Sequence, residues 1–165
     1  MIKTPSMLLG LPGLLCLIPA VSYSQYLDVK SLKGLDSLSV RIESPNADSA
    51  GIGITENLLK ADLERRLGEA GFTLVDDAPQ ALYLNVNLVK SAHSDEFACN
   101  IKLELLQGAW LERTDEWNYC STWYREFLGV YSGEDISAEI TATVSDLMDL
   151  FINDARSANP QNLKK

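Results

Sequence analysis

Apolar and polar residues alternate along several stretches of this chain, which predicts β-strands. The clearest are 38–44, 82–88 and 97–105, where nearly every second residue is apolar and its neighbours are polar. A period of two puts the apolar side chains on one face of a strand, so we expect one covered face and one wet face. Stretches 72–75 and 119–131 complete a set of five strands. Gly108 predicts a bulge or bend late in the fourth strand, because glycine packs poorly there.

Two stretches have a helical period instead. Residues 56–70 carry apolar side chains at every third or fourth position, and Thr55 and Gly71 stand where an N-cap and a left-handed C-terminal residue are expected. The period returns over 136–155, and Asn159-Pro160 ends it. The Gly-containing segment 45–53, which precedes the first helix, predicts a loop.

The predicted order of elements is therefore β-α-β-β-β-β-α. Strands with one wet face need cover on the other, and two amphipathic helices supply it. We predict an α+β fold, a two-layer sandwich whose mainly antiparallel sheet carries two helices on one face. This single domain spans 35–158, after a polar lead-in at 25–34 and before a disordered tail at 159–165.

The first 24 residues have the pattern of a secretory signal peptide. Lys3 precedes an apolar run from Met7 to Ala20, and the small residues Ser22 and Ser24 stand before the expected cleavage site. The run is broken by prolines and is shorter than the roughly 20 residues that span a membrane. We therefore expect a periplasmic or secreted protein with no stable membrane anchor after cleavage.

The acidic balance of the chain bears on its partners. Cleavage after residue 24 leaves 141 of 165 residues, the size of one domain, with 13 basic against 23 acidic residues and a net charge of −10. Such a surface repels phosphate backbones, so we expect no nucleic acid as a partner. The carboxylates are spread over every element, which is typical of a charge that serves solubility.

Recognisable catalytic motifs are missing from the sequence. It contains no G-x-S-x-G, P-loop, H-E-x-x-H or CxxC. The single histidine, His93, stands in the polar loop 91–96, where a surface role is commoner than a base or metal ligand. We expect no enzyme, no cofactor and no metal site. The alternative is a small secreted hydrolase, which would need two carboxylates facing each other across a pocket. Its candidates are Asp76, Asp77, Asp95 and Glu96.

Cys99 and Cys120 remain after the signal peptide, and an even pair in an oxidising compartment favours a disulfide. A hairpin that turns at Thr114–Trp117 would place Cys99 near Ser132 and Cys120 near Leu111 instead. The thiols would then be about 40 Å apart, whereas a disulfide holds the two Cα atoms roughly 4.4–6.8 Å apart. We therefore expect two separate thiols.

All three tryptophans lie within the stretch GAWLERTDEWNYCSTW. Trp123 shares a strand face with Phe127, which predicts a core position. Trp110 and Trp117, with Tyr119 and Tyr131, are candidate binding residues on the wet face, because aromatic side chains are enriched in binding hot spots. The alternative is that these rings only pair across the hairpin and stiffen it. The hairpin drawn above sets Trp110 opposite a residue on the face of Trp123, so exposing Trp110 requires the turn to move by one residue.

Three segments carry a resemblance to known proteins: ADLERRLGEAGFTLV, a strand containing STW, and the last helix LMDLFINDARSANP. In these the chain resembles a group of uncharacterised secreted bacterial proteins, over most of residues 35–160. At fold level it is also similar to small envelope accessory domains such as the outer-membrane lipopolysaccharide-assembly lipoprotein. The resemblance implies an overall plan and a compartment, and no reaction. The chain departs from lipoproteins in having Leu15 where a small residue should precede Cys16.

Together these features predict a periplasmic or secreted accessory domain that binds an envelope protein or glycan through its sheet face or hairpin. Two alternatives stay open. One is the small hydrolase described above. The other is a self-associating envelope protein that pairs an exposed edge strand with another chain.

Overall fold

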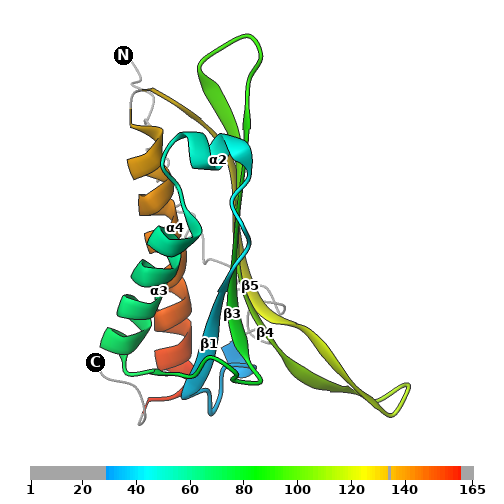
Figure 1. The fold of residues 1–165 in the computed structure, drawn as a ribbon. Coiled ribbons are helices and arrows are strands. Elements are labelled where there is room, and N and C mark those ends of the chain that lie inside the picture. Colours follow the sequence, from blue (N-terminus) through cyan, green and yellow to red (C-terminus); the bar gives the residue numbers. More distant parts are fainter. Residues whose placement is uncertain (1–28, 134, 161–165) are drawn as a thin grey trace, which may run out of the picture.

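The computed structural model describes residues 29–133 and 135–160. The predicted signal peptide (1–24) lies outside the described residues, as do 161–165 of the predicted tail. The described chain folds as α+β, which confirms the predicted class (Figure 1).

A five-stranded sheet with the order β2-β1-β3-β4-β5 forms the frame of the molecule. β1 pairs in parallel with both β2 and β3, whereas β3, β4 and β5 form two long antiparallel ladders. The expected antiparallel character therefore holds for the β3-β4-β5 half of a mixed sheet. The strands are β1 (Ser37–Ile42), β2 (Thr73–Leu74), β3 (Ala81–Lys90), β4 (Glu96–Leu111) and β5 (Glu116–Ser132).

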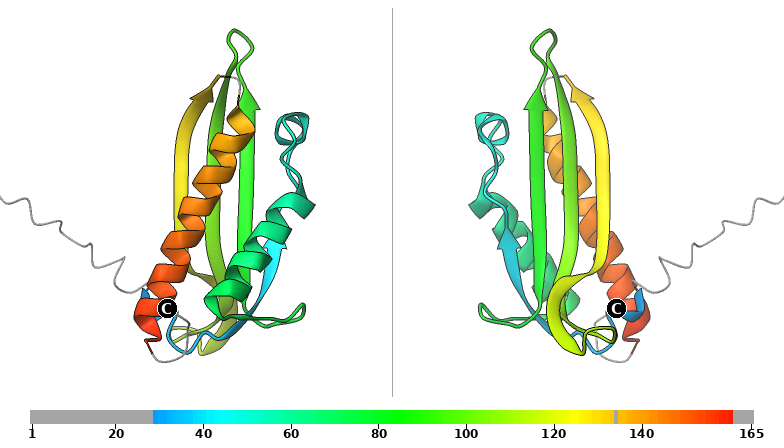
Figure 2. Two further views of the ribbon diagram at one scale, coloured as in Figure 1. Left: turned by 90° about the vertical axis from the view of Figure 1, so that its left-hand side faces the viewer. Right: turned by 90° about the vertical axis from the view of Figure 1, so that its right-hand side faces the viewer.

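The helices that the structure describes beside the sheet are α2 (Ala47–Gly51), α3 (Glu56–Ala70) and α4 (Ile136–Ala158). Figure 2 shows α3 and α4 side by side across one face of the sheet. The predicted caps are present, because Thr55 Oγ1 accepts from Leu58 N and Gly71 has the left-handed φ of 100°.

The predicted order lacked α2, so the prediction of a loop at 45–53 was wrong in part. Asn46 explains the extra turn of helix: its side-chain oxygen accepts from Ser49 N at 3.0 Å and caps the segment. Its amide donates to Leu88 O at 2.6 Å and ties α2 to β3. One side chain thus gives a glycine-containing segment the hydrogen bonds that its own propensity does not supply.

The core lies between the helices and the inner face of the sheet. Trp123, predicted to be buried, is wholly enclosed, and its ring meets Phe151 of α4 edge to face at 5.0 Å. The apolar positions of β4 from Phe97 to Leu105 are buried as their alternation predicts. Residues outside the predicted domain join them, because Leu32 of the lead-in is fully buried. We call the face toward α3 and α4 inner and the opposite face outer.

Asn159, assigned by its sequence position to the tail, is a buried anchor. Its side-chain oxygen accepts from Gly34 N at 2.6 Å, and its amide donates to Leu32 O at 2.7 Å and to Ala155 O at 2.9 Å. These bonds fasten the lead-in to the C-terminal end of α4. The structured domain therefore begins before residue 35 and ends after residue 158.

The hairpin register also differs from the prediction. The turn lies at 112–115, where Asp115 takes the left-handed φ of 57°, a conformation that aspartate tolerates better than most residues. Cys99 consequently faces Gly129 and Cys120 faces Gln107, not Ser132 and Leu111. Both cysteines are free thiols, as expected, since they remain far apart along the hairpin.

Candidate functional site

The β4–β5 hairpin continues beyond the helix layer as a separate arm. Leu105 pairs with Trp123 but Leu106 pairs with Ser121, so Thr122 is an extra residue that forms a β-bulge. Figure 1 shows the hairpin bending away from the helices past this point. We call residues 106–121 the hairpin arm. The sequence predicted a bulge at Gly108 on β4, whereas the structure places it on β5.

Side-chain hydrogen bonds fix the root of the arm. Ser31 Oγ donates to Thr122 O at 3.0 Å. Gln107 Nε2 donates to Thr122 Oγ1 at 2.8 Å and to Ser31 O at 3.2 Å. The backbone carbonyl of the bulge residue thus accepts from the lead-in, and its side-chain hydroxyl accepts from β4. These bonds set the direction of the arm.

Aromatic side chains occupy the outer face of the arm. Trp110 and Trp117 are directly opposite each other, with ring centroids 5.6 Å apart and ring planes at 73°. Both are exposed, Trp117 to 71%. Tyr119 follows two residues after Trp117 on the same face and is also exposed. Gly108 lies opposite Tyr119, and the Trp117 ring lies over it, with Cε3 in ordinary van der Waals contact, 3.6 Å, with the place where a Cβ would stand.

The structure therefore brings together three of the four predicted binding residues and separates the fourth. Tyr131 lies near the other end of β5, opposite Phe97. Its ring stacks on Phe127 at 5.6 Å, and its hydroxyl forms a hydrogen bond with Thr143 Oγ1 of α4. Burial raises the pKa of this hydroxyl above its usual value, although the bond to Thr143 opposes the shift. Tyr131 belongs to the packing between β5 and α4.

The bulge explains this separation. In an uninterrupted strand the odd-numbered residues 117, 119 and 131 share one face. The extra residue at Thr122 shifts the alternation by one, so Trp117 and Tyr119 face outward while Trp123 and Tyr131 face inward. It also resolves the conflict between a buried Trp123 and an exposed Trp110. In the sequence, this conflict was the only sign of the bulge.

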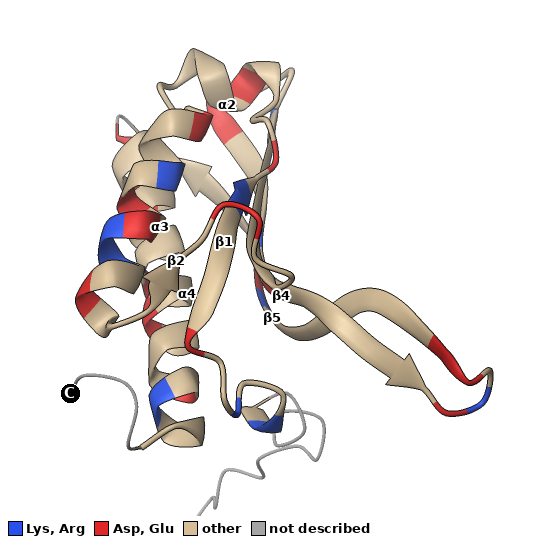
Figure 3. Cartoon of the chain, turned by 60° about the horizontal axis from the view of Figure 1, so that its bottom comes forward, with Lys and Arg blue, Asp and Glu red and all other residues tan. Residues whose placement is uncertain are grey.

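The tip of the arm is acidic. Figure 3 shows acidic residues on both sides of the turn and basic colouring between them. The turn is closed by hydrogen bonds from Thr114 N and Asp115 N to Leu111 O, at 3.2 and 2.9 Å. The charged residues are Glu112, Arg113, Asp115 and Glu116. The exposed tryptophans are thus bordered by a net negative charge.

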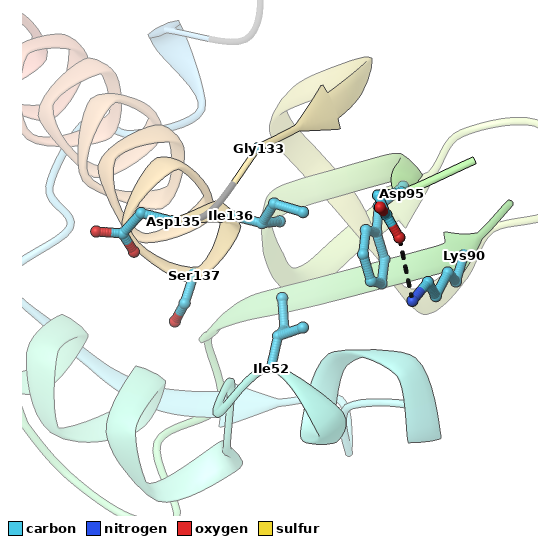
Figure 4. Close-up of a pocket in the computed structure, with 8 residues that line it drawn as sticks. Ile52, Lys90, Asp95, Gly133, Asp135, Ile136 and Ser137 are labelled. Atoms are coloured by element: carbon cyan, nitrogen blue, oxygen red, sulfur yellow. Dashed lines mark ion pairs between the residues drawn. The ribbon is translucent and has the colours of Figure 1, made fainter.

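A cavity of about 530 Å³ lies at the opposite end of the sheet, between α2 and the start of α4 (Figure 4). Its charged groups have partners within the fold. Lys90 Nζ lies 3.9 Å from Asp95 Oδ1 and 5.7 Å from the centre of the Phe97 ring. Asp135 caps α4 by accepting from Ala138 N at 3.2 Å. The lining residues are Ile52, Lys90, Asp95, Phe97, Gly133, Asp135, Ile136 and Ser137.

The hydrolase alternative needed a pocket with two of its four candidate carboxylates. Only Asp95 lines the cavity, and its side chain is fully exposed. Asp76 and Asp77 follow β2 and lie at the start of β3, whereas Asp95 and Glu96 lie beyond its far end. Glu96 is occupied locally, since its Oε2 accepts from Ser94 Oγ at 2.9 Å. The geometry does not bring the two pairs together.

The described part of the chain contains neither a cluster of metal ligands nor a helix that could span a membrane. Over residues 29–133 and 135–160, no three metal-ligating side chains cluster. His93 lies in the β3–β4 loop and is exposed. None of the helices that the structure describes is long and apolar enough to cross a membrane.

Comparisons with known proteins give a distant structural likeness. No protein-family model matches the chain, and no curated protein matches its sequence. Among solved structures it is similar to a minor lipoprotein from Acinetobacter baumannii, with 15% identity and a TM-score of 0.31 over 81% of this chain and 98% of that one. That match names a lipoprotein, as the sequence resemblance does, but not the lipopolysaccharide-assembly lipoprotein. At this TM-score the likeness supports no statement about function.

Proposed function

We propose that this is a periplasmic or secreted accessory protein that binds a partner protein of the bacterial envelope through the outer face of its hairpin arm. The observation that carries the proposal is the exposed tryptophan pair, Trp110 with Trp117, on an arm that none of the described helices covers. The signal-peptide pattern of the first 24 residues supports the compartment. Function by binding, without catalysis, remains part of the proposal.

The position of the pair favours recognition over folding. Trp117 is 71% exposed, so little of its surface is removed from water within this chain. Burying such a ring against a partner gains a large apolar contact at a small cost in side-chain entropy. The bonds of Ser31 and Gln107 at Thr122 already hold the arm in one direction. Binding therefore requires little further ordering of the backbone.

The charge of the arm defines the chemistry of the partner. Three carboxylates and one guanidinium border the tryptophans, in a chain whose net charge is −9. A complementary surface has an apolar hollow for the indole rings and lysine or arginine side chains around it. We therefore propose a protein with a basic rim, and a glycan is an alternative outcome of the test.

The test compares two double variants whose substitutions all lie on β5. Tyr119 and Tyr124 are exposed to almost the same extent, 47% and 48%, but lie on opposite sides of the bulge. An envelope extract is passed over immobilised wild-type protein and over the double variants W117A/Y119A and W117A/Y124A. W117A/Y119A should lose the captured partner, and W117A/Y124A should keep more of it because Tyr119 remains.

Tyr124→Ala alone is the matched control and should capture as much as the wild type. Equal losses in Y119A and Y124A would assign binding to the whole sheet face. Capture that survives W117A/Y119A in a folded protein would contradict the proposal. A captured species that is destroyed by glycosidase and resists protease would replace the protein partner by a glycan.

A further inference from the structure

A second surface of β5, on the body side of the bulge, is independent of the hairpin arm. β5 ends the sheet, and its strand neighbour among the described residues is β4. The opposite edge is stepped, because β2 pairs only with the first two residues of β1, and β1 pairs with β3 only as far as Leu84. From Trp123 to Ser132, β5 follows a regular register on β4. Its outward edge is a row of backbone N–H and C=O groups of the kind that pairs with another strand.

Apart from the inward-pointing Arg125, whose Nη1 donates to Tyr124 O at 2.8 Å, this stretch lacks the features by which proteins protect an edge strand. Between Trp123 and Ser132 there is no proline, no lysine and no second bulge. Its outer side chains include Leu128, exposed to 79%, and Val130, exposed to 64%. Such apolar side chains on an edge strand favour association over solvation.

The charges of the stretch favour a neutral partner strand. Its two charged residues are Arg125 and Glu126. Arg125 Nη2 bonds Asp154 of α4 at 2.6 Å, and Glu126 Oε1 accepts from Asn100 Nδ2 on β4 at 2.6 Å. The stretch is thus neutral, whereas the whole chain has a net charge of −9. The chain as a whole attracts basic partners, but this edge has no net negative charge with which to bind one. A neutral strand with alternating apolar side chains fits it, and β5 itself is such a strand.

We infer that the protein pairs with a second copy of itself, β5 against β5 in antiparallel orientation, over Trp123–Ser132. A two-fold axis perpendicular to the sheet joins the two sheets into one and keeps the outer faces continuous. The Glu126 charge selects the position of the axis. An axis at Glu126 would set two carboxylates face to face, whereas an axis at Leu128 sets Leu128 against the partner's Leu128 and Glu126 against the partner's Val130.

The first test measures molar mass by light scattering across a wide range of protein concentration. Wild-type protein should pass from monomer to dimer. Val130→Lys should stay monomeric, because a lysine on an edge opposes strand pairing. Val89→Lys is the matched control: Val89 is exposed to 63% on the outer face of β3, where the side chains of Asn46 and Asp48 already bond the neighbouring backbone at Leu88 O and Lys90 N. It should dimerise like the wild type.

A wild-type protein that is monomeric at every concentration would overturn the inference. An equal loss of dimer in Val89→Lys would also overturn it, because the contact would then be made by the sheet face and not by the edge.

The second test reports the register by oxidation of single cysteines in a Cys120→Ser background. Residues opposite each other in an antiparallel pair have Cα atoms roughly 4.5–5.5 Å apart, within reach of a disulfide. Leu128→Cys should therefore form a covalent dimer. In Val130→Cys the two thiols are displaced by about four residues, roughly 13 Å, and should stay apart. Cross-linking at 130 and not at 128, or at neither position, would refute this pairing.

The dimer inference does not rest on the proposed function. W117A/Y119A removes arm side chains beyond the bulge, so it should abolish partner capture and leave the molar mass unchanged. Val130→Lys should do the reverse. The two proposals therefore fail separately.

Discussion

Asp154 of α4 anchors β5 next to the root of the hairpin arm. Its Oδ2 accepts from Trp123 Nε1 at 3.0 Å and from Arg125 Nη2 at 2.6 Å. The Arg125 guanidinium lies over the Trp123 ring, 4.8 Å from its centre. Asp154→Ala leaves the indole N–H of a fully buried residue without this acceptor. An unmade buried hydrogen bond costs about 1–3 kcal/mol, and loss of the ion pair, whose side chains are 20% and 25% exposed, adds about 1 kcal/mol.

We therefore expect Asp154→Ala to lower the free energy of unfolding by about 2–4 kcal/mol. Asp154→Asn keeps a carbonyl oxygen for the indole N–H and loses only the charge, so its loss should be about 1 kcal/mol. The assay is urea unfolding followed by the fluorescence of Trp123 in a Trp110→Phe, Trp117→Phe background. Equal losses in the two variants, or a loss below about 0.5 kcal/mol in Asp154→Ala, would refute this account of the anchor.

Three further predictions concern the arm, the edge strand and a buried thiol. Trp117→Ala should lower the free energy of unfolding by about 1 kcal/mol and Trp123→Ala by about 3–5 kcal/mol, because only Trp123 is enclosed; equal losses in urea unfolding would place Trp117 in the core. Gly129→Ala should cost about 1–3 kcal/mol, since its Cβ would stand 2.6 Å from Cζ of the Phe127 ring; an unchanged melting temperature would contradict this. Burial raises the pKa of Cys99 from 9.0 to about 11, so the unfolded state ionises first and the free energy of unfolding of the wild type falls as the pH rises between these values. In urea unfolding, Cys99→Ala should lose less stability over this pH range. An equal fall in both proteins would contradict the assignment.

Local patterns predicted much of the fold. The alternation in β4 identified its buried face, because a half-covered strand must present its apolar residues on one side. Thr55 and Gly71 identified the ends of α3, since capping depends on the residue at one position. The burial of Trp123 followed from the same period.

Features that depend on distant contacts could not be predicted in this way. The bulge at Thr122 is held by Ser31 and Gln107, which are remote in sequence, and it alone decides that Tyr131 faces α4 while Trp117 faces outward. Asn159 stands beside Pro160 at the end of a helix, a position typical of a tail. It is buried because its side chain bonds Gly34 N and Leu32 O of the lead-in. The errors at α2, at the bulge and at Asn159 arose where a polar side chain bonds across the fold.

The most direct test of the binding role of the arm is photo-crosslinking in the cell that produces the protein. A photoreactive residue is placed at Trp117, and the matched control carries it at Val89, which is also exposed on the outer face but lies on β3. The account predicts one enriched envelope protein cross-linked at 117 and absent at 89. The absence of cross-linked products at 117 in folded protein, or the same products at both positions, would contradict the binding role. The tryptophan pair would then serve only to stiffen the hairpin.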